Sequence, residues 1–451
     1  MHRMHHARPS KTFALSALAM SLLLGHGAAS AQSNEAALMR RLDDLAAELS
    51  KVKAELVSIK DRQARDWQNA ATAATATTAA TAAAAAAGPA ATPVTASREP
   101  HAATQLTSYG EINYTRPNRD SAATTTDIAR FVLGFQHRFD ARTKVVAEVE
   151  VEHAVASSTD GGEVALEQVY VEHKLNDTYG LRAGLFLMPL GFVNQNHEPT
   201  AFYGVLRPAI DTSIIPTTLR EVGFQLFGEH DNGVSWSAGV STGPDLTKWD
   251  PADAEAAGSP LRAVHQEGQF AKSKNLSLFG AADWRGIPGL RVGGGLLTGK
   301  MAHGAPGFAA PNARFVLWDL HAKWTPGQWD LSAVYARGSI TGAGELNATF
   351  AGAPYLVPKA FDGLFVQAAY KFALAGGYSI APFARYERIN TGRQFDGVVP
   401  GLNATAYETE GIATVGANFN LTPSVVLKAD IQRYKVVKDS DRFNIGLGYS
   451  F

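Results

Sequence analysis

The chain ends in the run Phe443-Asn444-Ile445-Gly446-Leu447-Gly448-Tyr449-Ser450-Phe451, in which every second side chain is large and apolar. Successive side chains of a β-strand point to opposite faces, so this run has one apolar face and one face of small or polar residues. Such an alternation with period two predicts a β-strand whose two faces meet different surroundings.

The same alternation recurs upstream as far as about Gln105; Val149 and Val151, for example, flank Glu150. Each run is about ten residues long, the length that crosses a membrane as a tilted strand. The predicted strands cover approximately 105–115, 127–138, 144–153, 164–174, 179–187, 220–229, 234–243, 274–285, 290–298, 314–324, 328–337, 362–373, 378–389, 407–420, 425–436 and 441–451. We therefore expect an all-β fold, a 16-stranded antiparallel transmembrane β-barrel over residues 105–451.

The connections between these runs support a membrane barrel. Short turns rich in Gly, Pro, Asn and Asp alternate with longer loops, as in outer-membrane barrels. Aromatic residues flank the short turns, where a girdle at the membrane interface is expected: Phe139, Tyr179, Trp284, Trp324, Trp329, Phe372, Tyr378 and Phe419. The alternative, a soluble β-sandwich, would explain neither the girdle nor the even number of strands.

Composition excludes several classes of function. The chain has 41 basic and 42 acidic residues, 18 % charged in all, which leaves no electrostatic footprint for nucleic acid. It has no cysteine, which removes disulfides, thiol catalysis and Cys-based zinc sites. H-E-x-x-H, the motif of a zinc site on a helix, does not occur. We expect no cofactor, no metal and no enzymatic activity; the alternative, a barrel hydrolase, would lose its activity on mutation of a single Ser or Asp of the wall.

Residues 1–31 have the pattern of a secretory signal peptide. A basic start with Arg3, Arg8 and Lys11 precedes an apolar stretch, 12–24, and the small residues 29–31, so we expect cleavage before Gln32. The apolar stretch is shorter than the roughly 20 residues of a spanning helix. Export is therefore favoured over a retained helical anchor.

Residues 33–69 carry the seam of a coiled coil. Apolar residues alternate in steps of four and three: Leu38, Leu42, Leu45, Leu49, Val52, Leu56 and Ile59. Leu at one seam position with β-branched residues at the other favours trimers or tetramers; the alternative is a lone amphipathic helix. Residues 70–104 form a linker of low complexity, rich in Ala, Thr and Pro.

A 16-stranded barrel encloses an aqueous channel, because its interior is too wide for wall side chains to fill. The connection 188–219, which we expect to be the longest, is rich in proline and apolar residues and is the candidate constriction. Its charged members include His197, Arg207 and Asp211. A cap or a trimer latch outside the pore is the alternative for this loop.

Charged residues on the inward parity nearly balance in sign. Glu150 is one of the inward acids, whereas the arginines nearest the expected constriction are Arg130, Arg138, Arg182, Arg207 and Arg220. Because arginine binds carboxylate and phosphate through two parallel hydrogen bonds, this group is the candidate filter for small anions.

The segments Gly184-Leu185-Phe186-Leu187-Met188-Pro189-Leu190-Gly191-Phe192 and Leu219-Arg220-Glu221-Val222-Gly223-Phe224-Gln225-Leu226 resemble the phosphate-selective porin O and P family. The stalk before the barrel further resembles dicarboxylate-type porins. The terminal aromatics Tyr449 and Phe451 resemble the assembly signal of Gram-negative outer-membrane proteins.

The resemblance implies a homotrimer in the bacterial outer membrane, with its stalk in the periplasm, that admits small phosphate-like or dicarboxylate-like anions. Outer-membrane lipids, lipopolysaccharide, the barrel-assembly machinery and small solutes are the implied partners. Two alternatives stay open: a general or sugar-permeable porin, and a barrel that mainly anchors a periplasmic coiled-coil tether.

Overall fold

The computed structural model describes residues 103–157, 159–350, 352–397 and 404–451, together with Ala47 and Lys51. The predicted signal peptide and most of the predicted coiled coil and linker lie outside these residues. All strands of the fold belong to the unit Ser97–Phe451.

One closed antiparallel sheet makes up this unit. Each strand pairs with the next along the chain, and the first strand closes the ring by pairing with the last. The strands are β1 (Ala103–Pro117), β2 (Thr125–Arg138), β3 (Thr143–Glu152), β4 (Val164–Lys174), β5 (Tyr179–Leu187), β6 (Arg220–Glu229), β7 (Val234–Ser241), β8 (Ser277–Trp284), β9 (Leu290–Lys300), β10 (Arg314–Trp324), β11 (Trp329–Thr341), β12 (Pro358–Tyr370), β13 (Phe372–Ala373), β14 (Ser379–Phe395), β15 (Glu410–Thr422), β16 (Val425–Tyr434) and β17 (Arg442–Ser450). Both β12 and β13 pair with β14, so they are two pieces of one strand and the ring has the predicted sixteen.

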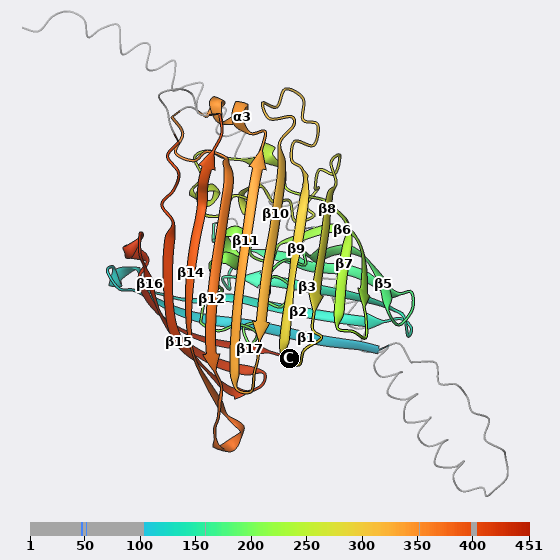
Figure 1. Cartoon of the computed structure of the whole chain (residues 1–451), viewed down its shortest axis with the longest axis vertical. Helices are drawn as coiled ribbons and strands as arrows, with labels where there is room; N and C mark the ends of the chain where they lie inside the picture. Colours follow the sequence, from blue (N-terminus) through green and yellow to red (C-terminus); the bar gives the residue numbers. More distant parts are fainter. Residues whose placement is uncertain (1–46, 48–50, 52–102, 158, 351, 398–403) are drawn as a thin grey trace, which may run out of the picture. The chain divides into compact units, whose positions relative to one another are not determined.

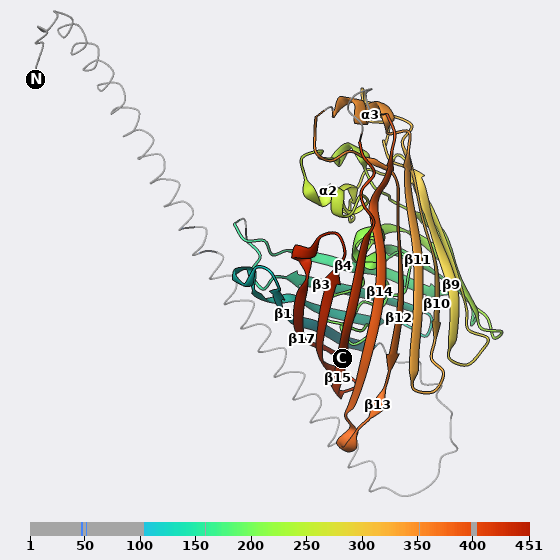
Figure 2. The same ribbon diagram turned by 60° about the vertical axis from the view of Figure 1, so that its left-hand side comes forward.

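Short turns gather at one end of the barrel and long connections at the other. In Figure 1 the strands β9 to β14 run from the end that carries α3 (Gly344–Thr349) to the end where the chain terminates, and β1 to β3 cross them at a large angle. Figure 2 shows α2 (Ala254–Gly258) at the same end as α3. We call the end with the short turns the turn end and the end with α2 and α3 the loop end. The connection 242–276 is longer than 188–219, so the expectation that 188–219 is the longest loop is wrong.

The remaining helical turns are short. They are η1 (Ser121–Ala123), the π-helical η2 (Ile210–Ile214), η3 (Leu246–Lys248), η4 (Arg262–Val264), η5 (Ala375–Gly377) and η6 (Lys438–Ser440). Within the described residues, no helix combines the length and the apolar composition needed to span a membrane.

Apolar side chains cover the outside of the barrel and charged side chains lie inside it, the reverse of a water-soluble protein. Outward side chains such as Phe131, Leu133 and Phe135 are 42–48 % exposed, whereas inward Arg130 and Glu150 are only 4 % and 5 % exposed. Exposed apolar surface on this scale needs an apolar partner. Three girdle aromatics, Trp284, Trp324 and Trp329, are also exposed at the turn end, as expected at a membrane interface.

Loops fill part of the lumen. An apolar cluster joins Ile210, Ile214 and Ile215 of the loop 188–219 to residues of the connections 242–276, 301–313 and 342–357, such as Leu246 and Met301. The cluster continues onto inward residues of β9 to β14, which include Leu297, Phe315, Leu317, Phe361, Phe365 and Ile389. The interior is therefore narrower than the strand number alone predicts, and the open space lies mainly against the other strands.

Candidate functional site

The loop 188–219 lies inside the barrel. Its middle contacts inward side chains of β1, β2 and β4, and its later residues contact inward side chains of β14 to β16. The alternative of a cap or latch outside the pore is therefore wrong.

On the wall formed by β1, β2 and β4, the loop is held by a buried polar network around His197. The Glu167 carboxylate accepts a hydrogen bond from the Tyr109 hydroxyl at 2.5 Å and lies 2.9 Å from His197 Nε2. Arg130 donates to the His197 carbonyl at 2.5 Å and to Glu111 at 2.8 Å. Hydrogen bonds to charged groups are stronger than neutral ones, so this network fixes the middle of the loop.

On the wall formed by β14 to β16, the loop backbone bonds to buried polar side chains. Asp430 accepts from the Val205 amide at 2.6 Å, and Glu387 accepts from the Ala209 amide at 2.8 Å. The Lys428 ammonium lies 3.6 Å from the centroid of the Phe202 ring, a cation–π contact. This wall therefore holds the loop through both hydrogen bonds and ring contacts.

The start of the loop rests on β9 and β10. Phe192 lies between His321, at 4.6 Å between ring centroids, and the Arg291 guanidinium, at 5.3 Å. Arg291 in turn donates twice to Asp283, at 2.6 and 2.9 Å. A side chain on Gly295 would meet the Pro189 carbonyl at 2.5 Å, so glycine allows the loop to approach the wall closely.

Toward the loop end, the loop borders two adjoining cavities. The first, of about 340 Å³, is lined by Arg207 and the inward residues Glu111, Arg130 and Arg442. We call it the arginine cavity. The second, of about 260 Å³, is lined by residues of the connection 242–276 and by Glu150, Glu163 and Arg220, among others. We call it the glutamate cavity.

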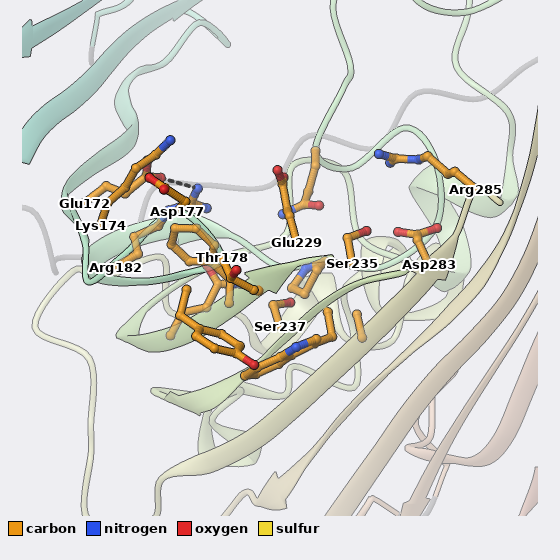
Figure 3. A pocket seen from close by; sticks show the side chains of 18 of the residues that line it. Glu172, Lys174, Asp177, Thr178, Arg182, Glu229, Ser235, Ser237, Asp283 and Arg285 are labelled. Carbon is orange, nitrogen blue, oxygen red and sulfur yellow. Dashed lines mark hydrogen bonds and ion pairs between the residues drawn. The ribbon is translucent and has the colours of Figure 1, made fainter. Parts of the chain in front are cut away.

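Toward the turn end, the loop covers a third cavity of about 460 Å³, which we call the vestibule. Its lining includes Pro189 and Gln195 of the loop. Figure 3 shows charged side chains of both signs around it: Glu172, Lys174, Asp177, Arg182, Glu229, Asp283 and Arg285. Arg182 and Lys144 both pair with Glu172, at 2.8 and 3.1 Å.

The five arginines predicted as one group do not form one cluster. Arg130 and Arg207 share the arginine cavity, Arg220 lines the glutamate cavity, and Arg182 lines the vestibule. Arg138 is exposed at the turn end beside Asp140. The prediction assumed that arginines on the inward face of their strands lie close to one another. In a wide barrel, however, inward residues lie at different heights and are spread around the whole ring.

The other predicted site residues have separate places. Glu150 lines the glutamate cavity, and His197 is buried in the wall network. Asp211 is 3 % exposed, in η2, and neither of its carboxylate oxygens has a hydrogen-bond partner among the described residues. It faces the interior of the protein and lines none of the three cavities.

Sequence reasoning missed Glu167, and a β-bulge explains why. The register between β3 and β4 shifts at Glu148/Val149, so the outward parity passes from Leu166 to Val169 and Glu167 points inward. A second shift between β1 and β2 carries Ala129 into the lining of the arginine cavity, although alternation with the outward Phe131 and Leu133 would predict that Ala129 faces outward. A bulge inserts one residue without changing composition, so alternation alone does not reveal it.

No metal-binding group of three or more His, Cys, Asp or Glu side chains occurs in the described part of the chain. The cavities beside the loop are instead lined by charged side chains, some of them in ion pairs such as Arg182 with Glu172. A solute in the described lumen would therefore contact mainly charged side chains.

A closed 16-stranded antiparallel barrel with an apolar outer wall, a polar inner face and a loop folded inside has a porin-like fold. No protein family model matches the chain. An uncharacterized protein of Aquifex aeolicus (strain VF5) is 28 % identical over 355 residues, covering 76 % of this chain and 79 % of that protein.

Solved structures resemble the fold at low sequence identity. OmpF of Salmonella typhi, solved in complex with daunomycin, matches with a TM-score of 0.53 and 12 % identity over 77 % of this chain and 97 % of its own. An anion-selective porin from Comamonas acidovorans matches with a TM-score of 0.49 and 11 % identity over 78 % of this chain and 100 % of its own.

Proposed function

We propose that the protein is an outer-membrane porin through which small polar solutes diffuse passively, with a preference for small anions. One observation carries this proposal: polar cavities lie on both sides of an in-folded loop, inside a barrel whose outer wall is apolar and exposed. An aqueous route across an apolar layer is what a diffusion channel requires.

The barrel also supports an orientation in the outer membrane. Outer-membrane barrels keep short turns in the periplasm and long loops outside the cell. The arginine and glutamate cavities would then face the exterior, and the vestibule would face the periplasm. Outer-membrane lipids and lipopolysaccharide would contact the outer wall, and Tyr449 and Phe451 would present the signal to the assembly machinery.

The preference for anions rests on Arg207. It lines the arginine cavity at the loop itself, whereas its neighbour Arg130 in that cavity pairs with Glu111 at 2.8 Å. Arg207 forms no ion pair with the described residues, so its charge is available to a solute. On the periplasmic side, Lys174 and Arg285 supply further positive charge in the vestibule, which also holds carboxylates.

Reversal potentials test this proposal. The refolded protein in a planar bilayer under a tenfold KCl gradient should give stepwise currents that favour chloride. Arg207→Ala should lower the anion-to-cation permeability ratio about two- to fivefold, the effect of one partly screened charge. Arg119→Ala removes an exposed arginine of the connection between β1 and β2 and should leave the ratio unchanged.

The alternatives give different results in the same experiment. Stepwise currents without ion preference would indicate a general or sugar-permeable porin. No current from folded protein would reject the channel and favour a barrel that anchors a tether.

We further propose that residues 33–69 assemble three copies of the chain. Deleting residues 33–100 should leave single-channel conductance unchanged and lower the temperature at which trimers dissociate on unheated gels. Loss of attachment between the outer membrane and the cell wall, with trimers unaffected, would instead support a tether.

A further inference from the structure

The arginine cavity and the glutamate cavity adjoin each other and differ in charge, because arginines and carboxylates balance in the first and carboxylates outnumber arginines in the second. Glu152 and Thr217 line both of them. A solute at this boundary would therefore meet arginine on one side and carboxylate on the other. Each charge can hold a solute only where the protein does not already neutralise it.

The carboxylates of the glutamate cavity divide into two groups. On the connection 242–276, Glu255 pairs with Arg262 at 2.7 Å, and Glu267 pairs with Arg220 at 2.8 Å. These ion pairs compensate the charge on that side of the cavity.

The carboxylates from β3 and from the residue before β4 are not compensated in this way. Glu150, Glu152 and Glu163 line the cavity, and no hydrogen bond joins any of them to a cationic side chain of the described residues. Glu150 is 5 % exposed, and the Arg130 Nη1 beside it is 4.0 Å away, beyond hydrogen-bond distance. A buried carboxylate without a hydrogen-bonded partner is unfavourable, so this wall of the cavity suits a cationic group.

The arginine cavity suits the opposite charge. Arg207 lines it without an ion pair to the described residues, and Nε of Arg442 and Nη1 of Arg130 have no hydrogen-bond partner there. Guanidinium groups bind carboxylates well. One solute carrying both an ammonium and a carboxylate group would thus satisfy the two cavities together.

We propose that the adjoining cavities form a binding site for amino acids, with the ammonium group against Glu150, Glu152 and Glu163 and a carboxylate against Arg207. This inference rests on the proposed function, since it assigns the class of solute that the porin admits preferentially. A plain dicarboxylate would fill only the arginine side and would be repelled by the glutamate side.

Glutamate and glutarate distinguish the two possibilities, because they share a carbon chain with two carboxylates and differ by the ammonium substituent. Proteoliposomes of the full chain should swell faster in isosmotic glutamate than in glutarate as sodium salts. Glu152→Gln with Glu163→Gln, both at partly or fully exposed positions, should lower the glutamate-to-glutarate rate ratio about two- to fivefold. Glu408→Gln, an exposed carboxylate in another long connection, should leave the ratio unchanged.

The outcomes separate the amino-acid site from the channel itself. A ratio that is the same in the wild type and in the double variant, with both solutes still entering, would overturn the amino-acid site and keep the channel. Entry of neither solute would reject the channel. If the double variant folds poorly, as judged by heat-modifiable mobility on gels, Glu163→Gln alone should still lower the ratio.

Discussion

At the scale of single residues, Asp211 is a loop side chain whose charge state should affect the stability of the protein. It belongs to the loop 188–219, not to a spanning strand. Burial, followed by the neighbouring carboxylates Glu387 and Asp319, raises its pKa to about 7. The folded state therefore holds a proton that the unfolded chain, with an ordinary aspartate pKa of 3.8, would release. This stabilising difference is full below about pH 4 and is lost as the pH rises toward 7.

Asp211→Asn should remove this dependence. The wild-type protein should unfold more easily at pH 8 than at pH 5, and the variant should show a smaller difference. At pH 8 the variant should be more stable by about 1–3 kcal/mol, the cost of one unsatisfied buried group. Thermal unfolding in detergent measures this, with Asp231→Asn, in an exposed turn, as control. Equal pH dependence in all three proteins would contradict the assignment.

At the scale of elements, the loop 188–219 is a strap fixed to several walls rather than a free segment. Glu167 accepts from Tyr109 and lies against His197 on one wall, and Asp430 accepts from Val205 on another. Loosening one attachment should therefore change how the loop fluctuates while leaving the sheet intact.

Glu167→Gln tests the attachment at His197. It replaces a charged acceptor whose hydrogen bonds contribute about 1.5–3 kcal/mol each. The loop should then fluctuate more inside the channel, and these fluctuations should increase the noise of the open-channel current. Single-channel recordings measure the noise. Glu198→Gln, at an exposed position next to His197, is the matched control, and equal noise in both variants would show that Glu167 does not restrain the loop.

At the scale of the whole molecule, the apolar outer wall makes stability depend on which face a residue occupies. Leu133 is outward in β2, 48 % exposed, and lies between Ser108 of β1 and Val149 of β3. A charge there must enter the hydrocarbon layer.

Leu133→Arg should destabilise the folded barrel by about 2–4 kcal/mol in lipid bilayers. Gln136→Arg places the same charge on the inward parity of the same strand and should cost much less. Denaturant titration in lipid vesicles compares the two variants. Similar losses for both would contradict a membrane around this wall.

The fold was predictable because the alternation of apolar and polar residues is a local property. Strands such as β4, β5 and β10 begin and end at the predicted residues, since lipid on one face and water on the other impose period two directly. The bulges beside Ala129 and Glu167 were not predictable, because the alternation of apolar and polar residues continues before and after one inserted residue.

The site was harder to predict, since it depends on the path of loops in three dimensions. The apolar residues Ile210, Ile214 and Ile215 correctly indicated that 188–219 folds inward. Leu246 and Leu261 carried the same signal in the connection 242–276 and also pack in the lumen cluster. Which arginines share a cavity is decided by that packing and not by their spacing in the sequence.

The cavities on the two sides of the loop are also displaced around the ring of strands. The arginine cavity lies against β14 to β17 and β1 to β3, whereas the vestibule lies against β3 to β10. A solute that visits both must turn sideways beneath the loop instead of travelling straight along the barrel axis. Stiffness should then limit entry as much as width does: of two molecules with equal cross-section, a flexible chain can follow the bend and a long rigid rod cannot.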